Sequence, residues 1–98
     1  MPINDTKAAK AFKALSNPHR LLVYKEIMQR QDSGLSAEKG CLLTDLLPCL
    51  KIGAPTVSHH IKELVNADLI RVEKNGKYMS CFLNESMKKE LQAFFLGL

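Results

Sequence analysis

The stretch APTVSHHIKELVNADLI, residues 54–70, constrains the fold more than any other part of the chain. Gly53 and Pro55 mark a helix start, because proline is favoured in the first helical turn. The apolar positions repeat at i, i+4, i+7 and i+8: Val57, Ile61, Leu64 and Val65. The polar positions on other faces, largely the opposite one, are Thr56, His59, His60 and Glu63. This pattern predicts a helix with one buried face whose polar first turns are open to solvent.

A β-hairpin is predicted directly after this helix, in LIRVEKNGKYMSCFL. Asn75-Gly76 is the strongest short hairpin signal, because a type I′ turn needs a positive φ at both central residues. That turn predicts three pairs: Lys74 with Lys77, Val72 with Met79, and Ile70 with Cys81. Four residues are then expected on the core face: Ile70, Val72, Met79 and Cys81. Those expected on the outer face are Arg71, Glu73 and Tyr78.

Two more helices are predicted near the N-terminus. In residues 5–15 the apolar side chains share one face at helical spacing: Ala8, Ala11, Phe12 and Leu15. A second helix is predicted from Pro18 to about Arg30, with Asn17 as its cap, since proline fits the first helical position. Residues 31–40 are polar and hold two glycines, which predicts a loop or a flexible hairpin.

The remaining elements are short or terminal. Residues 41–43 predict a very short strand, and Thr44 is the expected cap of a short helix after it. Pro48 removes a backbone donor from that helix, so we expect it to be short or distorted. The last helix is expected after Asn84, and its apolar face is Met87, Leu91, Phe94, Phe95 and Leu98. Such a face is too apolar to stay in solvent, so we expect it to dock on another surface.

The predicted order is helix, helix, strand, helix, helix, strand, strand, helix. Two short helices joined by the tight turn LKIGAP form a helix-turn-helix, and the hairpin after them forms a wing. The expected fold class is therefore mainly α with a small β-wing, a winged helix-turn-helix in a single domain over residues 1–98. The helix-turn-helix is expected at about residues 44–67 and the wing at about residues 69–83.

This motif points to DNA. The second helix of a helix-turn-helix enters the major groove with its N-terminal residues on base edges. The predicted base contacts are Thr56, Ser58, His59 and His60. The predicted phosphate contacts are Lys62, Arg71, Lys74 and Lys77. The net charge of +4 and the pI of about 9.1 favour a polyanionic partner. The alternative for these residues is an ordinary solvated helix start and solvated lysines.

Two segments, FKALSNPHRLLVYKEI and TDLLPCLKIGAPTVSHHIKELVNADLIRVEKNGKYMSCFL, resemble the ArsR/SmtB family of winged-helix repressors. The family pattern combines L-x-x-P-x-R-L, D-L-x-x-x-L, P-T-V-S-x-H-[LI] and a wing with a glycine at its tip. The matching residues include Leu15, Pro18, Arg20, Leu21, Asp45, Leu46, Leu50, Pro55, Thr56, Val57, Ser58, His60, Ile61, Leu64, Ala67, Leu69 and Gly76. The resemblance implies a homodimer held by the first and last helices, about residues 5–15 and 85–97. It also implies that the protein binds a palindromic operator and is released from it when an inducer binds.

The resemblance leaves the inducer open. Where many family members carry C-x-C this chain has Leu42 and Thr44, and its last helix lacks His and Asp, so the two commonest metal sites are missing. The family fold pairs the short strand with the second wing strand, which implies that Cys41 and Cys81 are neighbours, with Cys49 as a third candidate. We expect these thiols to sense an oxidant, arsenite or another thiophilic metal ion. The alternative is that they are small buried hydrophobic residues.

Other classes of function are less well supported. The adjacent His59 and His60 point about 100° apart on a helix and seldom chelate one ion. The sequence shows no Ser-His-Asp arrangement, no pair of carboxylates in an apolar setting and no glycine-rich phosphate loop, so we expect no enzyme. No apolar run nears the roughly 20 residues that span a bilayer, and no apolar signal region starts the chain, so we expect a cytoplasmic protein. The main alternative is a winged-helix module that binds a protein or RNA without an inducer.

Overall fold

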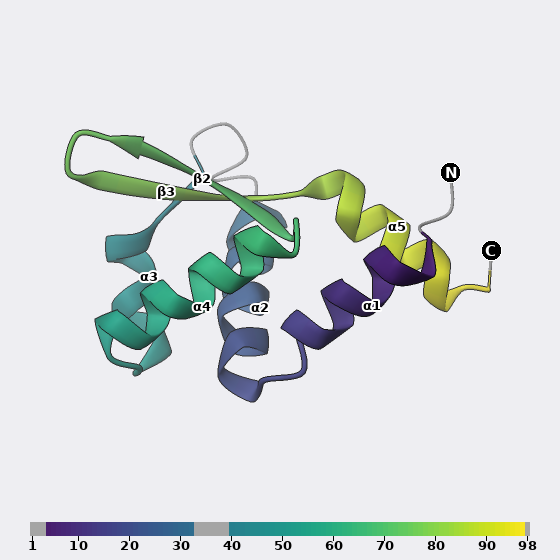
Figure 1. The fold of residues 1–98 in the computed structure, drawn as a ribbon. Coiled ribbons are helices and arrows are strands. Elements are labelled where there is room, and N and C mark those ends of the chain that lie inside the picture. Colours follow the sequence, from purple (N-terminus) through teal and green to yellow (C-terminus); the bar gives the residue numbers. More distant parts are fainter. Residues whose placement is uncertain (1–3, 33–39, 98) are drawn as a thin grey trace.

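The computed structural model describes residues 4–32 and 40–97 (Figure 1). Its helices are α1 (Asp5–Ala14), α2 (Pro18–Asp32), α3 (Leu43–Leu50), α4 (Ala54–Asn66) and α5 (Glu85–Phe95). Its strands are β1 (Cys41–Leu42), β2 (Ile70–Asn75) and β3 (Tyr78–Leu83). This order confirms the predicted winged helix-turn-helix. The predicted loop at residues 31–40 lies largely outside the described residues.

Asparagine side chains start two of the helices, as predicted. The Asn17 carboxamide oxygen accepts the backbone N–H of His19 at 2.9 Å, and the Asn84 oxygen accepts that of Met87 at 3.2 Å. These bonds satisfy donors that the first helical turn leaves without a partner. Asn17 therefore fixes where α2 begins, and Asn84 fixes where the chain turns from the wing into α5.

The start of α3 differs from the prediction. The helix begins one residue before Thr44, the cap position is Leu42, and no side chain makes a capping bond there. The expectation that Thr44 caps this helix is therefore wrong. The helix is short, at eight residues with Pro48 inside it, and it ends where Lys51 adopts a left-handed φ of 52°. The effect expected of Pro48 on the helix length is thus seen.

The three strands form an antiparallel sheet in the order β1-β3-β2. The hairpin register differs from the prediction by two residues, since Asn75 pairs with Tyr78 and Val72 with Cys81. The loop is Gly76-Lys77, and Gly76 has a φ of +61° while Lys77 does not, as in a type II′ turn. A shift of two residues keeps every side chain on its face. The residues expected on the core face therefore still share one face: Ile70, Val72, Met79 and Cys81.

The core lies between α2, α4 and the sheet. The predicted stripe of α4 is buried at Val57, Ile61 and Leu64, whereas Val65 is only partly buried. The other fully buried large side chains are Val23, Ile27, Leu46, Leu69, Cys81 and Met87. This core fixes α4 against the domain, with α1 and α5 side by side at the end opposite the hairpin tip (Figure 1). No helix within residues 4–32 and 40–97 has the length and apolar character needed to cross a membrane.

Candidate nucleic-acid interface

The exposed side of α4 carries most of the residues that were predicted to read bases. Thr56, Ser58 and His59 are all exposed in the first turns of the helix. Their exposure follows from the local sequence, because Val57 and Ile61 bury the opposite side at helical spacing. The small side chains of Thr56 and Ser58 leave the backbone of α4 open to close approach by a ligand. The structure therefore presents a short polar helix face to solvent.

His60 does not belong to this exposed face, and the expectation that it faces outward is wrong. Its side chain is 5% exposed. It lies three residues after Val57 and four before Leu64, so it falls on the buried side of the helix. The Arg20 Nε–H donates to His60 Nδ1 at 3.4 Å, which joins the start of α2 to α4. His60 thus helps to position α4 through its buried contact with Arg20 of α2. Its spacing from Val57 and Leu64 was the sequence signal for this role.

The surroundings of His60 favour its neutral form. Burial lowers its pKa from the ordinary value of 6.5, and the positive charge of Arg20 lowers it further, followed by His59 and His19. The bond from Arg20 places the lone pair on Nδ1 and hence the proton on Nε2. His60 Nε2 is buried and has no hydrogen-bond partner in the described part of the chain. The Arg20–His60 hydrogen bond, which joins α2 to α4, is therefore sensitive to protonation of His60.

We expect the protein to lose stability as the pH falls below 6.5, the ordinary pKa of histidine. Below that value His60 takes up a proton in the unfolded chain, while the folded side chain stays neutral until the pH passes its lowered pKa. Thermal unfolding from about pH 8 to about pH 5 measures the effect. The His60→Gln variant cannot titrate, so its unfolding temperature should fall less than that of the wild type. Exposed His59→Gln is the control and should stay much closer to the wild type than His60→Gln does, because His59 is a lesser cause of the lowered pKa than burial and Arg20. Identical pH profiles for all three proteins would contradict the prediction.

The wing lies beside one flank of α4. Ser58 and Lys62 of α4, together with Val72 and Met79 of the hairpin, line a groove of about 220 Å³. Lys74 and Lys77 are exposed near the hairpin tip. These lysines and α4 are therefore brought to neighbouring surfaces, as the prediction of phosphate contacts requires.

Arg71 is placed differently from the other predicted phosphate contacts. Its Nη1 pairs with Glu73 Oε1 at 2.7 Å, and its guanidinium carbon lies 4.0 Å from the centroid of the Phe82 ring. Arg71 and Phe82 lie on the face of the hairpin that points away from Val72 and Met79. The structure therefore does not bring Arg71 together with α4, and part of its charge is already compensated.

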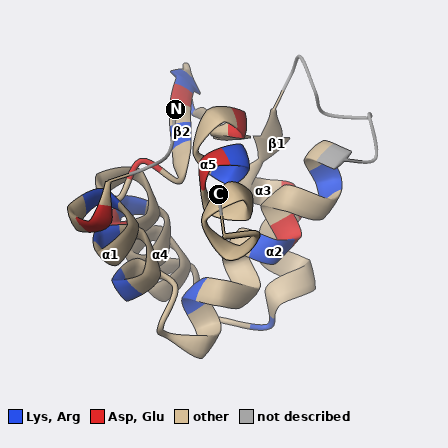
Figure 2. Cartoon of the chain, turned by 90° about the vertical axis from the view of Figure 1, so that its right-hand side faces the viewer, with Lys and Arg blue, Asp and Glu red and all other residues tan. Residues whose placement is uncertain are grey.

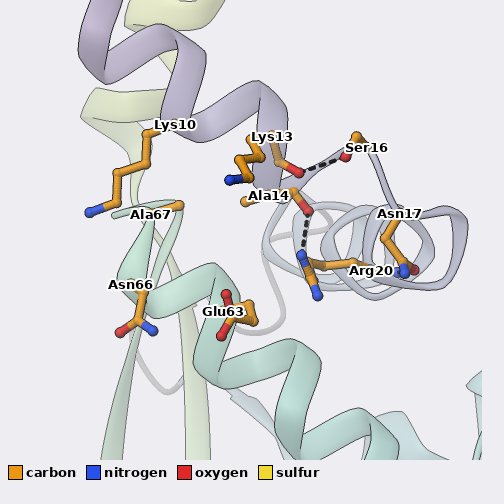
Figure 3. A pocket seen from close by; sticks show the side chains of 9 residues that line it. All are labelled: Lys10, Lys13, Ala14, Ser16, Asn17, Arg20, Glu63, Asn66 and Ala67. Carbon is orange, nitrogen blue, oxygen red and sulfur yellow. Dashed lines mark hydrogen bonds between the residues drawn. The ribbon is translucent and has the colours of Figure 1, made fainter.

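The other flank of α4 borders a cleft that sequence reasoning missed. Lys10 and Lys13 of α1, Arg20 of α2, and Glu63 and Asn66 of α4 line a cleft of about 470 Å³ (Figure 3). The sequence carries a signal for it, because Lys7, Lys10 and Lys13 recur every three residues along α1. That signal did not indicate that the lysines face α4. Figure 2 shows the Lys and Arg positions of α1 beside α4.

The three cysteines are free thiols in two different environments. Cys41 of β1 lies directly opposite Cys81 of β3, and both are buried, which confirms the expected strand pairing. Burial raises the pKa of Cys81 to about 12 and also raises that of Cys41, despite the opposing charge of Arg30. Cys49 is exposed on α3, where its sulfur accepts from Arg30 Nη2 at 3.0 Å.

The cysteines do not assemble into a larger ligand set. Within residues 4–32 and 40–97, no group of three or more His, Cys, Asp and Glu side chains is arranged to hold a metal ion. The candidate role of Cys49 as a third ligand beside Cys41 and Cys81 therefore stays a prediction. What the structure does bring together is one buried pair of thiols across two strands.

An apolar surface remains open where α1 and α5 meet. Phe95 and Leu96 are each 74% exposed, and Phe94 is 43% exposed. The ring of Phe12 lies 5.4 Å from that of Phe94 and 5.3 Å from that of Phe95, measured between centroids. This aromatic cluster, Phe12, Phe94 and Phe95, continues into an apolar groove of about 340 Å³ between α1, α2 and α5. Of the face expected to dock on another surface, Phe94 and Phe95 are thus exposed in the single chain, whereas Met87 and Leu91 are buried in its own core and Leu98 lies outside the described residues.

Three comparisons with known proteins agree with this geometry. The helix-turn-helix domain family matches residues 15–73. A protein of Methanocaldococcus jannaschii, named as an uncharacterized HTH-type transcriptional regulator, is 31% identical over 86 residues, or 87% of this chain and 86% of that protein. The crystal structure of an ArsR family transcriptional regulator has a TM-score of 0.75 over 99% of this chain and 91% of that one, at 18% identity. At 18% identity, the similarity to this crystal structure concerns the fold alone.

Proposed function

The chain belongs to the helix-turn-helix family of transcriptional regulators, and from this membership we propose that it is a dimeric repressor that reads a palindromic operator through α4. In this proposal an inducer releases the protein from DNA. The observation that carries it is the exposed polar start of α4, at Thr56, Ser58 and His59, on a helix whose flank shares a groove with the wing. An α-helix of about 10–12 Å diameter fits a major groove about 12 Å wide.

The proposed roles divide into reading and anchoring. Thr56, Ser58 and His59 contact base edges, where hydrogen bonds distinguish one base pair from another. Lys62, Lys74 and Lys77 contact phosphates, which supply affinity without sequence information. Arg71 is the weakest member of the second group, because Glu73 already pairs with it. His60 contacts no base in this scheme; it holds α4 in place through Arg20.

We expect Ser58→Ala and His59→Ala each to weaken binding to the cognate operator by about 1–3 kcal/mol, because each removes a contact to a base edge. Binding to a scrambled duplex of equal length should change little, since base contacts contribute only at the correct sequence. Fluorescence anisotropy with both duplexes at one salt concentration measures the two affinities.

Lys77→Ala is the matched control for this experiment. It removes a phosphate contact, so it should weaken both duplexes alike and lower the slope of log K against log salt by about 0.9. Equal losses on cognate and scrambled DNA for Ser58→Ala and His59→Ala would show that the start of α4 does not read bases. A protein that ignores duplex sequence altogether would favour a module for protein or RNA binding.

The dimer part of the proposal rests on the aromatic cluster of α1 and α5. Aromatic side chains bury about 150–250 Å² each when covered, and they seldom stay this exposed in a small protein without a partner surface. A second copy of the chain would cover the cluster and place two copies of α4 on one side of the assembly. Palindromic operators match such two-fold symmetry.

The inducer part rests on Cys41 and Cys81. Directly opposite residues on antiparallel strands have Cβ atoms about 4.5–5.5 Å apart, slightly more than a disulfide requires. β1 leads directly into α3, the first helix of the helix-turn-helix. Bridging the two sulfurs, by a disulfide or a thiophilic centre such as arsenite, would draw β1 toward β3 and shift α3 and α4. We therefore propose this pair as the sensing site.

A further inference from the structure

The cleft between α1, α2 and α4 holds more positive charge than the structure compensates. Three cationic side chains line it, Lys10, Lys13 and Arg20, against the single carboxylate of Glu63. Among the described residues, no carboxylate lies within 4.0 Å of the charged nitrogens of these three cations. Lys7, one turn away on α1, does have such a partner, because its Nζ lies 3.6 Å from Glu90 Oε2. The cleft therefore gathers three cations without an ion-pair partner among the described residues, against one carboxylate.

Arg20 is the best-anchored of the three cations. It is partly buried, and its Nη1 donates to the Ala14 carbonyl at 3.3 Å while its Nε donates to His60. Figure 3 shows the guanidinium held against the end of α1, with Lys10 and Lys13 above the facing side of α4. Both hydrogen-bond partners of Arg20 are neutral, so its partly buried guanidinium still attracts an anion.

The cleft occupies a defined place relative to the wing. Ser58 and Lys62 line the groove between α4 and the hairpin, whereas Glu63 and Asn66 line the cleft on the other flank. A helix seated in the major groove has a sugar-phosphate strand on each side, because it fills the width of the groove. In the proposed function, the lysines of the wing contact the phosphates of one of these strands. With α4 docked in this way, the other strand would pass the flank that carries the cleft.

We propose that this cleft is a second phosphate-binding surface, in which Lys10 and Lys13 contact the DNA backbone on the flank of α4 away from the wing. The inference rests on the proposed function, since it requires α4 to lie in the major groove. Arg20 adds positive charge at the inner end of the cleft, and the Asn66 carboxamide can donate to a phosphate oxygen. Glu63 opposes the phosphate, so its carboxylate weakens non-specific binding as well as operator binding.

The double variant Lys10→Ala/Lys13→Ala tests the proposal. It should lower the slope of log K against log salt by about 1.8, as expected for two lost phosphate contacts, and weaken cognate and scrambled duplexes alike. Glu63→Gln should change affinity in the opposite direction and strengthen both. The charge-matched control is Lys25→Ala/Lys89→Ala, which removes two exposed lysines that do not line the cleft, and it should leave the slope nearly unchanged. Thermal unfolding of each variant checks that the fold is intact.

Three results would overturn the proposal. The first is a slope for the Lys10/Lys13 variant equal to that of the Lys25/Lys89 control. The second is an affinity that Glu63→Gln leaves unchanged. The third is competition by inorganic phosphate beyond that of chloride at equal ionic strength, lost in the Lys10/Lys13 variant, because it would assign the cleft to a free anion. The proposed function fails separately, when the wild type shows no preference for any duplex sequence.

Discussion

In the proposed dimer, Phe95→Glu should separate the two copies into monomers and weaken operator binding at least about 100-fold. Phe95 is 74% exposed in the single chain and stacks at the edge of the aromatic cluster on α1 and α5. A buried carboxylate without a partner is costly at an interface, so a second copy could no longer cover the cluster. The loss in DNA affinity follows because two linked recognition helices bind with an avidity that a single one lacks.

Sedimentation equilibrium gives the assembly state for this experiment, and anisotropy with the operator gives the affinity. Ser86→Glu is the control, because it adds the same charge at an exposed position in the first turn of α5, where a negative charge suits the helix dipole. That variant should remain dimeric and bind normally. A Phe95→Glu protein that stays dimeric, or a monomer that keeps wild-type affinity, would rule out this interface.

The second large effect is expected at the buried thiols. A small disulfide oxidant, or arsenite, should lower operator affinity at least about tenfold, and Cys81→Ser should abolish the response. With the oxidant, Cys41 and Cys81 become a disulfide while the oxidant is reduced to two thiols. The reaction should be slow near neutral pH and faster at higher pH, because burial raises the pKa of Cys41 and raises that of Cys81 to about 12, which leaves little thiolate.

Cys49→Ser separates this site from the exposed thiol. Cys49 is exposed on α3, where its sulfur accepts from Arg30, and it is not strand-paired with Cys81 as Cys41 is, so the variant should keep the full response. Operator affinity before and after treatment, with the disulfide confirmed by mass spectrometry, is the measurement. A Cys81→Ser protein that still responds like the wild type would discard the sensing site. The two cysteines would then be ordinary core residues.

The sequence predicted the elements and most of their buried faces, because periodicity reports which side of a helix or strand the core requires. Val57 and Leu64 marked the buried side of α4, and Asn17 and Asn84 marked helix starts through capping chemistry. The same periodicity indicated His60 as buried, but its polar character outweighed its position in the prediction. A histidine can enter a core when a neighbour such as Arg20 satisfies one ring nitrogen.

Other features depend on contacts that a single segment does not encode. The predicted turn type of the hairpin was wrong. Asn75-Gly76 favours the register that pairs Lys74 with Lys77, whereas the sheet in which β3 pairs with both β1 and β2 has Asn75 opposite Tyr78. The cleft of Lys10, Lys13 and Arg20 was missed because three separate helices form it. Local patterns show that α1 carries lysines, but only the arrangement of α1, α2 and α4 around the cleft shows that Lys10 and Lys13 line it.

The most direct test of the account is selection of duplexes from a random-sequence DNA library by the wild-type protein, with the mass of the resulting complex measured in solution. We expect enrichment of a two-fold symmetric site, with half-sites about 34 Å apart and one protein dimer bound per site. Its central claim is that the polar start of α4 reads bases in two adjacent major grooves. Binding without sequence enrichment, or a complex that holds a single copy of the chain, would contradict it.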